Sequence, residues 1–182
     1  MALSQQERIE LLSLARKAVE SAVTAGPPPT CEQATELMNE QRGCFVTLKN
    51  NDRLRGCIGQ FVGRGPLWQN VVEMGVAAAA DPRFVFDPIT PAELPQLTVE
   101  VSVLSPLRES ENPLEEIELG THGIYIVGPS SGCFLPEVAT EQGWSARQFL
   151  DHCCASKAGM ETEAWQRPDT TVYLFTSEKF SD

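Results

Sequence analysis

Apolar residues recur at helical spacing near the start of the chain. Ser4 and Glu7 form a capping-box pattern, and the apolar positions after them predict a helix from about residue 5 to about residue 24. One glycine and three prolines at positions 26–29 end this helix. Thr30 and Gln33 resemble a second capping box, so we expect a short helix near 31–39. Further helices are predicted from Pro66 to Asp81-Pro82, over 113–117, and from Ser145 to Gly159.

Alternating apolar and polar residues mark the expected strands. The clearest is Leu97–Leu104, whose odd-numbered residues are apolar and share one face. Gly43–Leu48 and Leu54–Phe61 flank Asn50-Asn51-Asp52, which predicts a β-hairpin. The remaining strands are expected over Gly123–Val127, Gly132–Leu135 and Thr171–Phe175. Because the strands come mostly in hairpins with helices between groups, we predict an α+β fold with a mostly antiparallel sheet and flanking helices.

The segment Leu54–Gly59, with the sequence LRGCIG, carries the most distinctive chemistry. Residues two apart in a strand point to the same face, so we expect Arg55 and Cys57 side by side, with Leu54 and Ile58 opposite. A guanidinium beside a thiol favours the thiolate, the reactive form of cysteine. Gly56 and Gly59 allow another backbone or a ligand to approach closely.

Composition limits the classes of function. The 182 residues include 25 acidic and 14 basic side chains, which gives a net charge of −11. This charge repels phosphate backbones, so direct nucleic-acid binding is not expected, although a local basic pocket remains compatible with one small anion. The longest mainly apolar run, near 71–80, is interrupted by Glu73 and is too short to span a membrane. The N-terminal residues lack a secretory signal pattern, so we expect a cytoplasmic protein.

The six cysteines predict neither a disulfide framework nor a metal centre. They contain no CxxC pair, and we expect them to be reduced thiols, mostly in the core. His152, Cys153 and Cys154 cannot converge on one ion in a helix, because consecutive residues are about 100° apart. The residues therefore predict no metal and no cofactor.

Several further segments follow the hexapeptide in a fixed order. They are Asp81–Phe84, Glu100–Leu104, His122–Ile124, Phe134–Ala139 with Gly143-Trp144, and Lys157–Gly159 with Trp165. Together these segments resemble the AMMECR-type domain family, whose bacterial and archaeal members are called AmmeMemoRadiSam system protein A. The resemblance covers nearly the whole chain. One departure is the pair Cys153-Cys154, where the family usually has a leucine-rich helix with a single cysteine.

The resemblance implies a specific organisation. Residues 1–182 are expected to form a single AMMECR-type domain with a larger and a smaller lobe and a cleft bordered by the hexapeptide. The family also implies a link to a Memo-like protein and a radical S-adenosylmethionine (radical SAM) enzyme. It implies no assigned reaction.

Three residues, Cys57, His122 and Glu137, are catalytic candidates. Cys57 would be a nucleophile, and the alternative is a small buried thiol in a glycine-kinked strand. His122 would act as its base if the two lie together, with Glu100 or Glu137 orienting the ring. The alternative is that His122 is simply half-exposed at a turn.

The remaining candidates would bind a ligand. Arg55 and Arg83 suit the capture of a carboxylate or phosphate, and the alternative is internal ion pairs with Asp81, Asp87 or Glu137. Gly56, Gly59 and Trp144 complete this set, although a tryptophan is also a common core anchor.

Two functions follow from these candidates. The first is an enzyme component whose cleft holds a small anionic or nucleotide-like ligand on Arg55 and Arg83, with Cys57 as the reactive group. The second is a non-catalytic accessory that binds a Memo-like protein or a radical SAM enzyme, because no recognised catalytic signature occurs in the sequence. A third, a regulatory role linked to nucleic acids, is disfavoured by the charge of −11.

Overall fold

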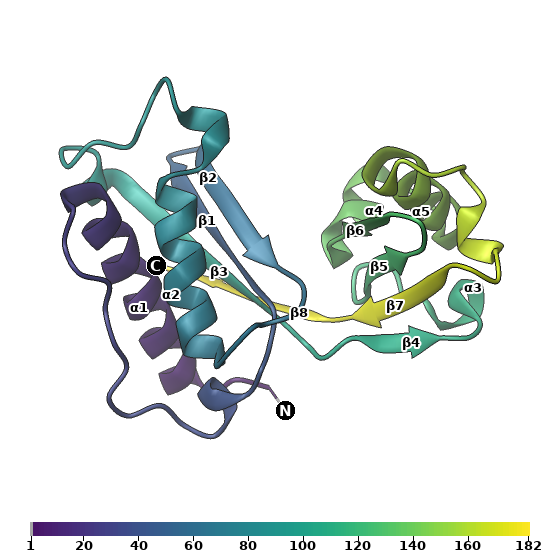
Figure 1. Cartoon of the computed structure of the whole chain (residues 1–182), viewed down its shortest axis with the longest axis horizontal. Helices are drawn as coiled ribbons and strands as arrows, with labels where there is room; N and C mark the ends of the chain where they lie inside the picture. The colour runs from purple at the N-terminus through teal and green to yellow at the C-terminus, as the bar shows by residue number, and fades with distance from the viewer. Residues whose placement is uncertain (1) are drawn as a thin grey trace. The chain divides into compact units, whose positions relative to one another are not determined.

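The computed structural model describes residues 2–182, and these divide into two compact units (Figure 1). The first unit runs to Leu104 and includes Glu178–Asp182, while the second is Ser105–Ser177. Each unit has its own four-stranded sheet and its own hydrophobic core. The expected α+β fold with a larger and a smaller lobe is confirmed.

The first unit packs two long helices on one sheet. Its strands are β1 (Cys44–Asn50), β2 (Arg53–Gln60), β3 (Leu97–Leu104) and β8 (Ser177–Ser181), in the order β2-β1-β3-β8. Helices α1 (Gln5–Thr24) and α2 (Leu67–Ala79) lie side by side on one face of the sheet (Figure 1). Buried alternate residues of β1 and β3, such as Val46 and Val101, join the helices in the core. A hairpin turn at Asn51, which has a left-handed φ of 52°, connects β1 and β2.

The second unit is smaller. Its strands are β4 (Arg108–Ser110), β5 (Gly123–Val127), β6 (Ser131–Phe134) and β7 (Thr171–Phe175), in the order β4-β7-β5-β6. Its helices are α3 (Pro113–Glu116), α4 (Pro136–Gln142) and α5 (Ala146–His152). The expected capping box at Ser145 and Gln148 starts α5, and a π-helical turn, Cys153–Ala158, continues it to Gly159.

One expected helix is absent from the described residues. The segment 31–39 contains only a 3-10 turn, Leu37–Asn39, so the prediction of a helix starting at Thr30 is wrong. The Thr35 hydroxyl, just before this turn, accepts the Met38 N–H (3.3 Å) and donates to the Glu7 carboxylate (2.6 Å). Other 3-10 turns are Pro82–Phe84, Leu94–Gln96 and Ala164–Gln166. Over residues 2–182, no helix has both the length and the apolar character needed to cross a membrane.

Candidate functional site

A β-bulge in β2 reverses the expected arrangement of the hexapeptide. Leu48 pairs with Gly56 and Lys49 pairs with Leu54, so Arg55 is an extra residue without a partner position in β1. Cys57 pairs with Thr47, two residues from Lys49, which puts Cys57 and Leu54 on the same face. Arg55 lies on the other side and lines a cavity with residues of α1 and α2. The prediction that Arg55 and Cys57 share a face is therefore wrong.

The Arg55 guanidinium is bound by carboxylates of the same unit. Its side chain is 2% exposed, and it donates from Nε to Glu93 (2.6 Å) and from Nη1 to Asp87 (3.1 Å). Nη2 donates to the Asp87 carbonyl (3.0 Å) and the second Glu93 oxygen (3.1 Å). The hydrogen bonds from Arg55 lower the pKa of Glu93 below its usual value. Of the two expected alternatives, the structure has the internal ion pair.

Arg83 is also paired, and together with Asp81 it holds the backbone of Cys57. The Asp81 carboxylate accepts the Cys57 N–H (3.0 Å), while Arg83 Nη2 donates to the Cys57 carbonyl (3.0 Å) and to Asp81 (2.6 Å). Hydrogen bonds from Arg83 are the main cause of the lowered pKa of Asp81. Because β2 is an edge strand, these two side chains satisfy backbone groups that a neighbouring strand would otherwise bind.

Both glycines of the hexapeptide are required by packing within the unit. A Cβ on Gly56 would lie 2.1 Å from the carbonyl oxygen of Ala78 in α2. A Cβ on Gly59 would lie 2.1 Å from the ring of Phe45, its partner in β1. The close approach expected at these glycines is therefore made by a helix backbone on one face and an aromatic ring on the other.

Cys57 belongs to a row of side chains on the face opposite α1 and α2. Cys57, Thr47 and Glu100 occupy matching positions of β2, β1 and β3, and we call these three residues the thiol row. The Thr47 hydroxyl donates to the Cys57 sulfur (3.2 Å). The ammonium groups of Lys49 and Lys179 lie 3.6 Å and 3.7 Å from the Glu100 carboxylate. A thiol, a hydroxyl, a carboxylate and two cations thus gather on one face.

Sequence reasoning missed three members of this group. Thr47, Lys49 and Lys179 were not candidates, and Glu100 entered only as a group that could orient His122. The alternation of Thr47 and Lys49 along the predicted strand was a usable signal, because residues two apart share a face. Lys179 could not be found in this way, since strand β8 was not predicted.

Four of the other cysteines are held as thiols by burial. Burial raises the pKa of Cys44 to about 12 and that of Cys133 to about 11. It also raises the pKa of Cys153 and of Cys154. Cys31, the sixth cysteine, lies in the irregular segment between α1 and β1, where no strand or helix positions it.

The second unit holds the remaining candidates. His122 Nδ1 accepts the Glu118 N–H (3.1 Å), so a neutral ring carries its proton on Nε2. Glu137 lies in the first turn of α4. The Trp144 ring stacks on His152, with centroids 4.1 Å apart. These residues and Cys57 belong to different units, so the pairing of Cys57 with His122 stays a prediction.

The motif His152-Cys153-Cys154 serves packing. Cys153 and Cys154 are both fully buried in the core of the second unit, while His152 stacks on Trp144. Within residues 2–182, no group of three or more histidine, cysteine, aspartate or glutamate side chains is arranged to hold a metal ion.

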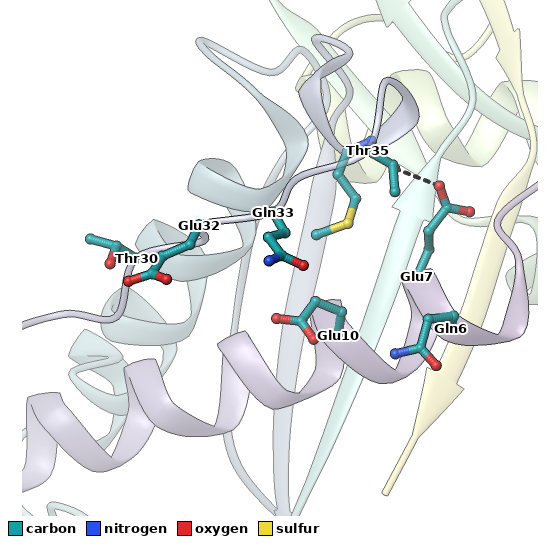
Figure 2. A pocket seen from close by; sticks show the side chains of 8 residues that line it. Gln6, Glu7, Glu10, Thr30, Glu32, Gln33 and Thr35 are labelled. Atoms are coloured by element: carbon teal, nitrogen blue, oxygen red, sulfur yellow. Dashed lines mark hydrogen bonds between the residues drawn. The ribbon is translucent and has the colours of Figure 1, made fainter.

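A cavity of about 390 Å³ beside α1 is unsuited to an anion (Figure 2). Glu7 and Glu10 of α1 face Glu32 and Thr35 of the following segment across it. The hydrogen bond from Thr35 is the largest cause of the lowered pKa of Glu7, which therefore stays charged. The three carboxylates would repel the small anionic ligand expected from the sequence.

A second cavity lies at the ends of α1 and α2, on the side of β2 that carries Arg55. It has a volume of about 580 Å³ and a mostly apolar lining. Arg55 and Asp81 contribute its charged groups. Both are already paired within the first unit, so this cavity also lacks an available cation for an anion.

Comparison with known proteins gives one consistent result. The AMMECR1 family profile matches residues 12–180. Protein MK0488 of Methanopyrus kandleri is 40% identical over 190 residues, which cover 99% of this chain and 90% of that protein. Protein TK0174 of Thermococcus kodakarensis is 42% identical over 187 residues, with 94% and 88% covered. The crystal structure of PH0010 from Pyrococcus horikoshii matches with a TM-score of 0.81 and 36% identity, covering 95% of this chain and 90% of that one.

Proposed function

We propose that this chain, which belongs to the AMMECR1 family, is an enzyme component whose reactive group is the Cys57 thiol. The observation that carries the proposal is the thiol row. Cys57 is half-buried, its sulfur is hydrogen-bonded to Thr47, and the strand register places it on the sheet face opposite the two helices. A cysteine thiolate is a strong nucleophile, and a neighbouring hydroxyl donor supports that form.

The ligand in this proposal is a small anion held by lysines. Arg55 and Arg83 are engaged by carboxylates at short distances, so the two lysines that contact Glu100 of the thiol row are better candidates. The side chains of Lys49 and Lys179 are 42% and 41% exposed. Both ion pairs are long and both ammonium groups are partly exposed, so each ammonium can also bind a ligand anion while it keeps its contact with Glu100.

His122 fits a hydrogen-bond donor better than a base. Its Nδ1 lone pair is used by the Glu118 N–H, which leaves Nε2–H as the group that can reach a ligand. We therefore propose that His122 acts as a donor to a ligand within the second unit, with Glu137 and Trp144 as further contacts of that unit. This replaces the nucleophile–base pair by two separate roles.

Alkylation by iodoacetamide tests the role of Cys57. We expect Cys57 in the folded protein to react several-fold faster than in urea-unfolded protein, with the site identified by peptide mass. Cys57→Ser should remove the fast phase, and Cys31→Ser is the matched control that should keep it. A folded-state rate at Cys57 no higher than the unfolded rate would reject the nucleophile.

Anion binding is tested separately. Inorganic phosphate and citrate should raise the melting temperature of the wild type, and Lys49→Gln combined with Lys179→Gln should remove that shift. Lys17→Gln, a change on α1, is the control for the loss of positive charge. An equal shift in the double variant and the control would count against the lysine site.

A second candidate function is favoured by a different observation. Phe86 is fully exposed and Val85 is 64% exposed, in the loop after α2. Exposed aromatic side chains are typical anchors of protein interfaces. We therefore also propose that this loop binds a Memo-like protein or a radical SAM enzyme. Phe86→Ser should abolish co-purification with such a partner, and Val62→Ser, another exposed apolar position, should not.

A further inference from the structure

We infer that the cavity at the ends of α1 and α2 binds an uncharged, mainly apolar small molecule that carries one carbonyl-type acceptor. This site is distinct from the thiol row, because the bulge puts Arg55 on the helix side of β2 and Cys57 on the other face. The inference does not depend on the proposed function, since it requires no reaction at Cys57.

The size and lining of the cavity fit a small molecule. Its volume of about 580 Å³ lies within the range of about 300–1,000 Å³ that is usual for ligand pockets. The lining is apolar apart from Arg55 and Asp81. The apolar residues are Ala22, Val23, Ala79, Ala80, Pro82, Phe84, Val85, Pro88 and Ile89.

The charges around the cavity cancel. Arg55 is bound to Asp87 and Glu93, and Arg53 shares Asp87 (2.5 Å), so two guanidiniums balance two carboxylates. The carboxylate of Asp81, which is 3% exposed, is likewise neutralised by Arg83. A charged ligand would lose its hydration without gaining an unpaired counter-charge, and this favours a neutral one.

The helices reinforce the selection against anions. Ala22 and Val23 belong to the last turn of α1, and Ala79 is the last residue of α2. The C-terminus of a helix carries a partial negative charge from its carbonyl groups. Two such ends therefore meet at the cavity, and they disfavour a carboxylate or phosphate there. A cation gains no unpaired carboxylate there, because Asp81, Asp87 and Glu93 are all paired with guanidiniums.

Arg55 supplies the polar contact. A guanidinium has five N–H donors, and the contacts to Asp87 and Glu93 use four of them. One N–H on Nη1 has no acceptor among residues 2–182, although the side chain is only 2% exposed. Because Arg55 lines the cavity, a carbonyl oxygen of a ligand can accept this N–H. The ligand class is therefore an apolar molecule with an amide or ketone group.

Three ring compounds that differ in charge test this class. Benzamide, benzoate and benzylamine are titrated into the full-length ¹⁵N-labelled protein, and amide shifts are followed. We expect benzamide to give saturable shifts at Ala22, Ala79 and Val85, and the two charged compounds to bind at least fivefold more weakly. Equal or tighter binding of benzoate, or no saturable shift with benzamide, would overturn the inference.

Two variants locate the site. Ala80 is exposed and follows α2, so Ala80→Phe can fill the cavity without entering the core, and it should weaken benzamide binding at least tenfold. Ala92→Phe, at an exposed position outside the lining, is the matched control and should bind as the wild type does. Val85 lies in the exposed wall of the cavity, and Val85→Asn should also weaken benzamide binding. Circular dichroism verifies folding, and unchanged binding in folded Ala80→Phe and Val85→Asn proteins would contradict the assignment.

Discussion

The buried carboxylate of Asp81 accepts the backbone N–H of Cys57 at 3.0 Å, although 24 residues separate them in the chain. Arg83 completes the contact by donating to the Cys57 carbonyl. The family motif Asp81–Phe84 and the hexapeptide are therefore parts of one local structure. Because both contacts are to the backbone, they fix the position of β2 at Cys57 without using the thiol.

Removing the Asp81 charge should destabilise the first unit. Asp81→Asn keeps the size of the side chain but loses the ion pair to Arg83, and its amide leaves the contacts to Cys57 and Arg83 incompletely satisfied. We expect a loss of about 1–3 kcal/mol in the free energy of unfolding, measured by urea titration. Asp52→Asn, in the exposed hairpin turn, is the control and should change stability by less than about 0.5 kcal/mol.

The same carboxylate makes stability depend on pH in the acid range. The pKa of Asp81 is lowered in the folded protein, mainly by hydrogen bonds from Arg83, so its stabilising effect is present above the unfolded value of about 3.9. As pH falls below about 4, the unfolded chain binds the proton first and this stability is lost. Urea titrations at pH 6, 4 and 3 should show a smaller acid loss in Asp81→Asn than in the wild type. An identical loss in both proteins would show that Asp81 makes no contribution.

Local sequence pattern predicted the longer regular elements but missed several short ones. The capping box at Ser4 predicted α1 with its observed bounds, Gln5–Thr24, and alternation predicted Leu97–Leu104 as β3. Strand β4, with three residues, and strand β8 were missed, because short polar edge strands show little alternation. Helix α4 was missed as well, since Leu135-Pro136 reads as the end of a strand.

The site was less accessible to sequence reasoning because it depends on register. A regular strand predicts that Arg55 and Cys57 share a face, and the single extra residue at the bulge reverses this. The ion pair between Arg55 and Glu93 joins positions 38 residues apart, and the thiol row joins three strands. These relationships are set by tertiary pairing, which residue type and spacing do not specify.

Gly56 should be the least replaceable glycine of the hexapeptide. In Gly56→Ala the new methyl group would lie 2.1 Å from the Ala78 carbonyl, so β2 or α2 must move. We expect a loss of about 1–3 kcal/mol, visible as a lower melting temperature. Gly65→Ala is the matched control, because its Cβ would meet only the flexible side chain of Gln69, at 3.2 Å. Equal melting temperatures of the two variants would contradict the packing argument.

The Thr47 hydroxyl should set the reactivity of the Cys57 thiol. Thr47→Val removes the hydrogen bond to the sulfur while keeping a β-branched strand residue, so the thiolate loses a donor. We expect iodoacetamide to react several-fold more slowly with Cys57 in this variant. Thr47→Ser, which keeps the hydroxyl, should restore the rate. A slow rate in both variants would instead indicate a change in strand geometry.

Substitutions of Arg55 and Arg53 test how much the buried ion pair stabilises the fold, because both side chains contact Asp87 but only Arg55 is buried. Lysine cannot reproduce the fork of donors that reaches Glu93 and Asp87 together. Arg55→Lys should therefore leave an oxygen of the largely buried Glu93 carboxylate unsatisfied and cost about 2–4 kcal/mol in urea unfolding. Arg53→Lys, at a 67% exposed side chain, should cost less than about 1 kcal/mol. If the two substitutions cost the same, the bulge that buries Arg55 would have no energetic role.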